Sequence, residues 1–253
     1  MAIASWLEAG AWGLLAGSAL VIGAAIGHAF RVPPRAVAGA MAFGSGVLIS
    51  ALSFELVHEA FQRGGFVPTA GGFLAGGVMF TVVNVWLSRR GAGHRKRSGH
   101  QQAKAGEDDR SSLSIALGAL LDSVPESIVI GLSLLENGVV NGAAVAAVFL
   151  SNVPEGLSSA AGMKNALRTK AYIFGVWSAI ALASGVGAIA GFILFENASD
   201  TLIAATSAVA AGAILAMLVE TMIPEAFSDA HELAGLIAVL GFLCAFGLGK
   251  AGG

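Results

Sequence analysis

Long apolar runs separated by short polar segments make up almost the whole chain. A helix needs about 20 predominantly apolar residues to cross a bilayer, and hydropathy gives eight runs of roughly that length. They extend over residues 9–30, 36–61, 69–88, 112–135, 139–163, 171–195, 201–227 and 231–249. The pattern predicts an all-α integral membrane protein in which eight transmembrane helices form a compact bundle. Residues 1–253 are then a single transmembrane domain.

The amino-acid composition also indicates an integral membrane protein, and it limits the possible binding partners. Of the 253 residues, 56% are hydrophobic and 12% are charged, whereas soluble domains have about 25% charged residues. A net charge of -2 gives no basic excess for a nucleic-acid partner. The single cysteine excludes an internal disulfide and a metal cage of several thiolates. The predicted surroundings are therefore a lipid bilayer.

The basic residues predict the orientation of the chain. With eight spans, all of the 14 Lys and Arg residues except Arg63 and Lys250 fall on one side of the membrane. Cytoplasmic loops carry the excess of Lys and Arg, so both termini are expected to be extracytoplasmic. The only long hydrophilic segment, 89–111, lacks apolar periodicity and is predicted to be a disordered cytoplasmic loop between the third and fourth spans.

Carboxylates and other polar side chains interrupt the fourth and fifth spans. Asp122 and Glu126 are four residues apart and share one helix face, and Ser151 and Glu155 repeat that spacing. Asn152 lies three residues before Glu155. Because the two spans run antiparallel, these groups are expected at one depth near the midplane. An ionisable side chain at that depth costs about 2.5–3.5 kcal/mol on insertion scales, which favours a functional role.

A proline accompanies each pair of polar residues. Pro125 and Pro154 each remove a backbone N–H and free the carbonyl four residues earlier. Carboxylates and loosened backbone on two facing helices form the oxygen-rich cavity that a hard or borderline divalent cation prefers. The alternative is a structural device in which protonated acids are hydrogen-bonded inside kinked helices.

The sequence around these residues resembles the ZIP (Zrt/Irt-like) family of divalent-metal transporters, in particular its prokaryotic GufA-like branch. That family carries His-Asn-x-Pro-Glu-Gly and His-(Asp/Glu)-x-Pro-Glu-Gly on its fourth and fifth spans, where this chain has DSVPES at 122–127 and SNVPEG at 151–156. The resemblance extends over nearly the whole chain. It implies eight spans, both termini outside, a long cytoplasmic loop after the third span, a midmembrane metal site and a homodimer.

The departures from the family motifs change the expected ligands. Asp122 and Ser151 stand where the family has histidine, with Ser123 and Asn152 as their neighbours. By the resemblance, the metal ligands are carboxylates with amide and hydroxyl help. They are Asp122, Glu126, Glu155, Asn152, Ser151 and Ser123. An oxygen-only set weakens the case for Zn²⁺ and favours Mn²⁺, Fe²⁺ or Mg²⁺.

Two further groups of ionisable residues lie near span ends. An entry funnel for cations, or a solvated helix end, is predicted at Glu55, His58 and Glu59. An exit or regulatory site on the cytoplasmic side, or an exposed turn, is predicted at Glu220, Glu225, Asp229 and His231.

These observations favour a permease in a bacterial-type cytoplasmic (inner) membrane that carries a divalent cation of the Zn²⁺, Mn²⁺ or Fe²⁺ class inward. The ion is substrate, no organic cofactor is expected, and the protein is not an enzyme. A non-transporting homologue with a degenerate metal site, sensory or structural, is one alternative, and a transporter with an altered substrate is another. Motifs such as Gly-x-Gly-Asp and His-Glu-x-x-His do not occur in the chain, which disfavours an intramembrane hydrolase.

Overall fold

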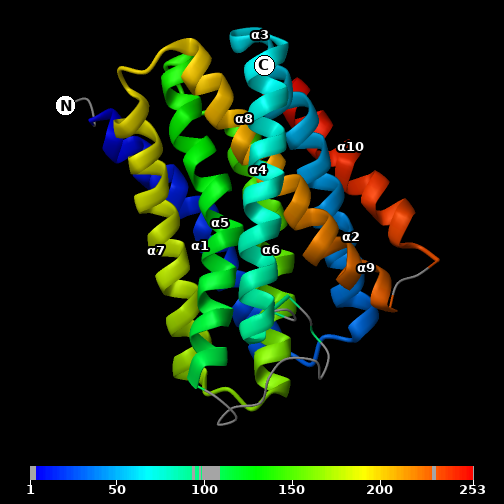
Figure 1. Ribbon diagram of the computed structural model, residues 1–253. Coiled ribbons are helices and arrows are strands. Elements are labelled where there is room, and N and C mark those ends of the chain that lie inside the picture. The colour runs from blue at the N-terminus through cyan, green and yellow to red at the C-terminus, as the bar shows by residue number, and fades with distance from the viewer. Residues whose placement is uncertain (1–3, 93–94, 97, 99–108, 230–231, 253) are drawn as a thin grey trace.

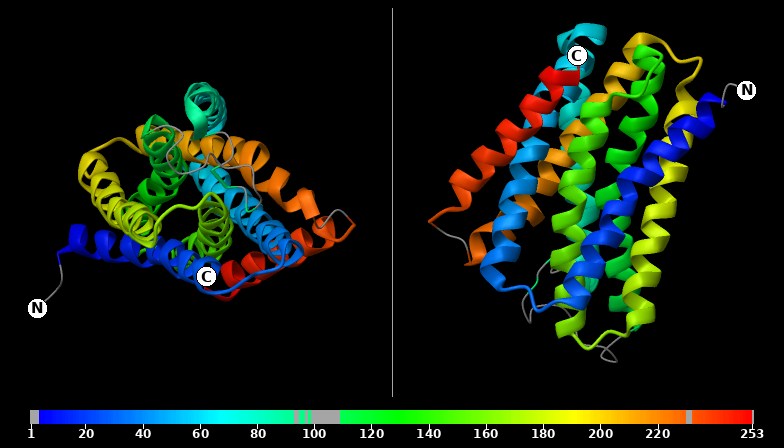
Figure 2. Two further views of the ribbon diagram at one scale, coloured as in Figure 1. Left: turned by 90° about the horizontal axis from the view of Figure 1, so that it is seen from below. Right: turned by 180° about the vertical axis from the view of Figure 1, so that it is seen from behind.

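The chain folds into a bundle of long helices that run roughly lengthwise through the molecule (Figures 1 and 2). The structure is a computed structural model that describes residues 4–92, 95–96, 98, 109–229 and 232–252. The described residues form helices and no strand. Both ends of the chain lie at the same end of the bundle in Figures 1 and 2.

Three of the long helical rods contain a π-helical turn. The first half of the chain forms α1 (Ser5–Ala29), α2 (Pro34–Ala51), η1 (Leu52–Val57), α3 (His58–Gly64), α4 (Phe66–Leu87) and η2 (Ser88–Ala92). The second half forms α5 (Asp109–Asn137), α6 (Gly142–Asn165), α7 (Lys170–Phe195), α8 (Asp200–Met217), η3 (Leu218–Met222), α9 (Ile223–Asp229) and α10 (Ala234–Gly252). Such π turns are rare and frequently occur at functional sites.

Local sequence signals account for where several helices begin. Asn141 caps α6 by accepting hydrogen bonds from the backbone N–H groups of Ala143 and Ala144. Thr169 and Ser199 cap α7 and α8 in the same way. A side-chain oxygen at this position satisfies backbone donors that have no partner inside the helix. These caps place the turns of the bundle at short polar segments.

Seven helical segments of the described chain are long and apolar enough to cross a membrane. They correspond to the predicted ranges apart from 139–163, which forms α6. This helix is continuous over 24 residues, but the polar residues Ser151, Asn152 and Glu155 interrupt its apolar sequence. Most of α6 is buried within the bundle, so its polar residues face protein. The fold is that of an α-helical protein suited to a membrane.

Small residues bring α1 against α6. A Cβ at Gly23 would overlap the backbone carbonyl of Val153, and a Cβ at Gly156 would overlap that of Leu20. Helices in lipid approach closely where such residues face each other. This close contact holds α6 against α1 near Pro154 and so positions the polar residues around that proline.

The hydrophilic segment 89–111 differs from the expected disordered loop in its described parts. Helical structure continues through Ala92, and α5 already begins at Asp109. Arg95, Lys96 and Ser98 are buried, with 2%, 4% and 9% of their surfaces exposed. The physical reason is that buried acids on α5 and α6 attract these cations into the bundle. The other residues of the segment lie outside the described residues.

Candidate cation site

The three acids predicted from the fourth and fifth spans are all buried inside the bundle. Asp122 and Glu126 on α5 are each 2% exposed, and Glu155 on α6 is 3% exposed. Pro125 and Pro154 lie inside these helices, next to the acids. Buried charges require a partner because the interior solvates them poorly. The partners of these carboxylates therefore indicate what the site accommodates.

Asp122 forms the best-paired contact of the site. Its Oδ1 accepts a hydrogen bond of 2.8 Å from Nη2 of Arg95, and its Oδ2 accepts one of 2.9 Å from Nε. This two-point geometry is the strong form of an Arg–carboxylate pair. Burial acts to lower the pKa of Arg95, but the charge of Asp122 and its hydrogen bonds offset that, and the pKa lies above its usual value.

Lys96 bridges the two helices that carry the acids. Its Nζ lies 3.3 Å from Oδ2 of Asp122 and 2.7 Å from Oε1 of Glu155. Both contacts are ion pairs that join α5 to α6. The single ammonium is thus shared between two carboxylates, whereas the guanidinium of Arg95 forms a two-point contact with one.

Three buried oxygens at this level lack a hydrogen-bond partner among the described residues. They are Oε1 of Glu126, Oδ1 of Asn152 and Oε1 of Glu155, the last of which is ion-paired with Lys96. An unsatisfied buried oxygen costs about 1–3 kcal/mol, and more when it is charged, so such atoms call for a water, a proton or an ion. All three are hard donors of the kind that a divalent cation of the Mn²⁺ or Mg²⁺ class binds.

The remaining predicted ligands are turned toward their own surroundings. The hydroxyls of Ser123 and Ser151 donate to the backbone carbonyls of Ala119 and Val148 on their own helices. Nδ2 of Asn152 donates to the carbonyl of Ala16 on α1, a bond of 3.0 Å that leaves its Oδ1 as the free atom. Within the described chain, no three His, Cys, Asp or Glu side chains are grouped so that they could hold a metal ion.

A polar chain continues from Arg95 to η3. Nη1 of Arg95 donates to Oδ1 of Asn84 at 2.7 Å, and Nδ2 of Asn84 donates to Oε2 of Glu220 at 2.5 Å. Thr81 donates to the other oxygen of Glu220 at 2.6 Å. The carboxylate of Glu220 is thus tied to α4 and linked through Asn84 to the central acids.

Glu225 belongs to a separate contact on α9. Its Oε1 accepts hydrogen bonds from the backbone N–H of Ser98 at 2.8 Å, from the hydroxyl of Ser98 at 2.5 Å and from the hydroxyl of Ser158 at 3.2 Å. Glu225 is only 2% exposed, so it holds Ser98 against the bundle. The side chain of Asp229 and the whole of His231 lie outside the described residues.

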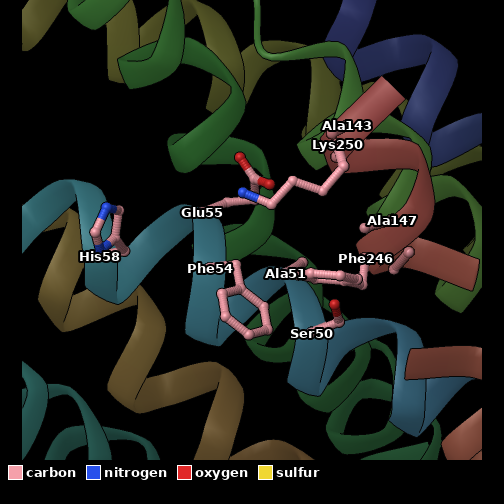
Figure 3. A pocket seen from close by; sticks show the side chains of 11 residues that line it. Ser50, Ala51, Phe54, Glu55, His58, Ala143, Ala147, Phe246 and Lys250 are labelled. Carbon is pink, nitrogen blue, oxygen red and sulfur yellow. The ribbon is translucent and has the colours of Figure 1, made fainter. Parts of the chain in front are cut away.

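Two of the three predicted funnel residues, Glu55 and His58, line a cavity (Figure 3). The cavity has a volume of about 250 Å³ and is lined by Glu55 and His58 of the α2–α3 rod and by Phe246 and Lys250 of α10. Oε2 of Glu55 accepts a 2.7 Å hydrogen bond from Asn141, while Lys250 points toward the Glu55 carboxylate in Figure 3. Glu59 lies 3.4 Å from Nδ2 of the same Asn141.

A small apolar cavity lies between this pocket and the central acids. It has a volume of about 20 Å³ and is lined by Glu126 together with Leu48, Leu52 and Val129. Ala51 lines both cavities. The surroundings between Glu55 and Glu126 are therefore largely apolar.

Sequence reasoning missed the cations and the amide that complete the network. Arg95 and Lys96 lie in a segment rich in basic residues, where nothing distinguishes a buried cation from a solvated one. Asn84 could have been found, because an amide within an apolar run commonly hydrogen-bonds to a neighbouring helix. Searches against protein-family models and curated proteins found no match to this chain.

Proposed function

We propose that the chain is a ZIP-like permease that carries a divalent metal cation into the cytoplasm. In this proposal all eight long helices cross the cytoplasmic membrane, both termini are outside, and the protein is a homodimer. The supporting topology is the lengthwise course of the helices, with both ends at the same end of the bundle. The basic residues of 89–111 and 164–170 then lie inside.

One observation carries the proposal. Oε1 of Glu126, Oδ1 of Asn152 and Oε1 of Glu155 are buried oxygens without hydrogen-bond partners, contributed by two helices that each contain a proline. Carboxylates at this depth are costly. Oε1 of Glu155 is paired with Lys96 at 2.7 Å, and a divalent cation is a partner that these three oxygens could share. Glu126 and Glu155 are the principal ligands, Asn152 supplies a neutral oxygen, and Asp122 sets the charge beside them.

The cavities support a path for the ion. The pocket beside Glu55 gathers cations at the outer end, and the apolar region near Glu126 separates it from the site. Opening that region while closing the inner side would give alternating access, which in many transporters is a movement of one helix group against another. Glu220 and Glu225 lie on the inner side of this scheme and form its exit.

The proposal is tested by metal uptake into proteoliposomes that contain the purified full-length protein. Mn²⁺, Fe²⁺, Zn²⁺, Co²⁺, Cd²⁺ and Mg²⁺ are compared for the wild type, Glu126→Ala and Glu155→Ala. Glu196→Ala is the control because Glu196 is an exposed residue at the end of α7. Saturable uptake of one of these ions, lost in both site variants and kept in the control, supports the permease.

A second function is favoured by a different observation. Arg95 and Lys96 already compensate Asp122 and Glu155, as they would in a ZIP-like protein that has lost transport and uses the acids as structural ion pairs. Absence of uptake for every ion, with Glu155→Ala clearly less stable than the wild type, would favour this structural role. Uptake that persists when divalent ions are chelated would instead indicate an altered substrate.

A further inference from the structure

Two cations from the segment between η2 and α5 occupy the acidic site. Arg95 and Lys96 are 2% and 4% exposed, so their charges are removed from water almost completely. Gly118 on α5 makes room for the first of them, because a Cβ there would lie 2.5 Å from Cδ of Arg95. The cations are accommodated by packing as well as by charge.

The two cations are held in different ways. Arg95 binds both oxygens of Asp122 and also donates to Asn84, so three of its nitrogens have a partner. Lys96 has one charged nitrogen on a flexible stem, shared between Asp122 and Glu155. A guanidinium in a two-point contact is fixed by geometry, whereas an ammonium acts as a mobile point charge.

Lys96 and a divalent cation need the same oxygen. Nζ of Lys96 lies 2.7 Å from Oε1 of Glu155, which is one of the three oxygens proposed above to bind the ion. Oε1 of Glu126 and Oδ1 of Asn152 complete the set, and no cation of the described chain pairs with either. A dication at these oxygens would also repel the ammonium beside them. The ion and Lys96 therefore exclude each other.

We propose that Lys96 is a built-in competitor that neutralises Glu155 in the metal-free protein and is expelled when a divalent cation binds. Arg95 stays on Asp122 and keeps that carboxylate out of the coordination sphere. The inference rests on the proposed function, since it assumes that a divalent cation binds here. In addition to the proposed function, the Lys96 ammonium would set the affinity of the site for the ion. It would leave Glu155 each time an ion binds.

The reactivity of the Lys96 amine tests the displacement directly. Purified full-length protein is treated with a water-soluble acetylating reagent in chelator and in saturating Mn²⁺ or Zn²⁺, and acetylation is read at each lysine by mass spectrometry. A buried ammonium paired with acids reacts slowly, and a released amine reacts faster. We expect acetylation of Lys96 to rise at least about fivefold with the ion. Lys170 is exposed and outside these pockets, so its acetylation should stay constant.

Substitution of the competitor gives an independent measurement. Lys96→Gln removes the charge and keeps the length, so the apparent affinity for Mn²⁺ or Zn²⁺ in equilibrium dialysis should rise. If Glu155 is free of Lys96 in about one molecule in ten, the gain is about tenfold. Lys164→Gln is the control, because Lys164 donates to the backbone carbonyl of His28 and touches no acid of the site.

The outcomes separate this inference from the proposed function. Ion binding and uptake without a rise in Lys96 acetylation, or with unchanged affinity in Lys96→Gln, overturn the competitor and leave the permease standing. Acetylation of Lys96 as fast as that of Lys170 in the metal-free protein also overturns it. If no divalent ion binds even to Lys96→Gln, both the permease and the competitor are wrong.

Discussion

A double-mutant cycle on Arg95 and Asp122 measures how strongly the loop cations stabilise the bundle. The substitutions are Arg95→Met, which keeps an unbranched stem, and Asp122→Asn, which keeps the shape of the side chain. Asp122→Asn leaves Arg95 without its carboxylate, Arg95→Met leaves Asp122 with Lys96 alone, and the double change removes both charges of the pair. Arg95 and Asp122 are 2% and 1% exposed in their side chains and pair at 2.8 Å.

The expected magnitude follows from that burial. Two unit charges about 4 Å apart interact by about 4 kcal/mol at an effective dielectric constant of about 20. Removing one partner of a buried pair costs about 3–5 kcal/mol because the other charge stays uncompensated, whereas removing both together is often close to neutral. We expect Asp122→Asn to lower the free energy of unfolding by about 3–5 kcal/mol. Arg95→Met costs less, because Lys96 still lies 3.3 Å from Asp122.

The assay is equilibrium unfolding of purified protein in detergent, in a chelator that removes divalent ions. Unfolding is followed by tryptophan fluorescence, to which Trp177 contributes as a buried reporter at 2% exposure. The matched control is the pair between Arg63 and Asp200, which has the same 2.8 Å distance but side chains 22% and 73% exposed. An exposed pair contributes about 0–1 kcal/mol.

A coupling free energy above about 2 kcal/mol for the buried pair, and well above that of the control pair, supports the reasoning. Additive single changes, with a coupling below about 0.5 kcal/mol, refute it. In that case Arg95 would not be in contact with Asp122 in the folded protein. The acids of α5 and α6 would then need a different partner.

Two further predictions concern packing and membrane exposure. Gly23→Ala places a methyl group against the carbonyl of Val153 and is expected to lower the free energy of unfolding by about 1–3 kcal/mol. At the control position, Gly175→Ala, nothing lies within 4 Å, so the thermal unfolding midpoint should stay unchanged or rise. An equal loss of stability in both variants would refute the close contact. Cys244 is exposed on the apolar helix α10. In proteoliposomes its thiol should therefore react with an uncharged maleimide and resist a charged thiol reagent. Equal labelling by both reagents would place Cys244 in water.

The sequence predicted the helical class and the residues at the centre of the bundle for a clear physical reason. Apolar runs of bilayer length are a strong signal, and acids within them are costly enough to stand out. Asp122, Glu126 and Glu155 are indeed buried together with their prolines. The weakest span signal belongs to α6, because a helix surrounded by protein need not be apolar on every face.

The partners of those acids could not be predicted in the same way. The segment 89–111 has seven basic residues of similar surroundings in the sequence, and hydropathy treats all of them as solvated. Which cation enters the bundle depends on the space beside Gly118 and on the positions of Asp122 and Glu155, which are properties of the folded chain. The same holds for Ser98, whose contact with Glu225 joins segments far apart in sequence.

The distribution of charge between spans and loop has a physical consequence for how the site is built. A Lys or Arg in the centre of a span adds about 2.5–3.5 kcal/mol to the cost of inserting that helix. Here the helices α5 and α6 carry the acids, and the segment before α5 carries the cations. The ion pairs therefore form only after the helices have assembled, and they stabilise the assembled bundle over separate helices. A cation delivered by a loop is also one that can leave without moving a transmembrane helix. In the proposed mechanism, the arrangement that makes Lys96 a stabilising partner of Glu155 is thus the one that would let a divalent cation replace it.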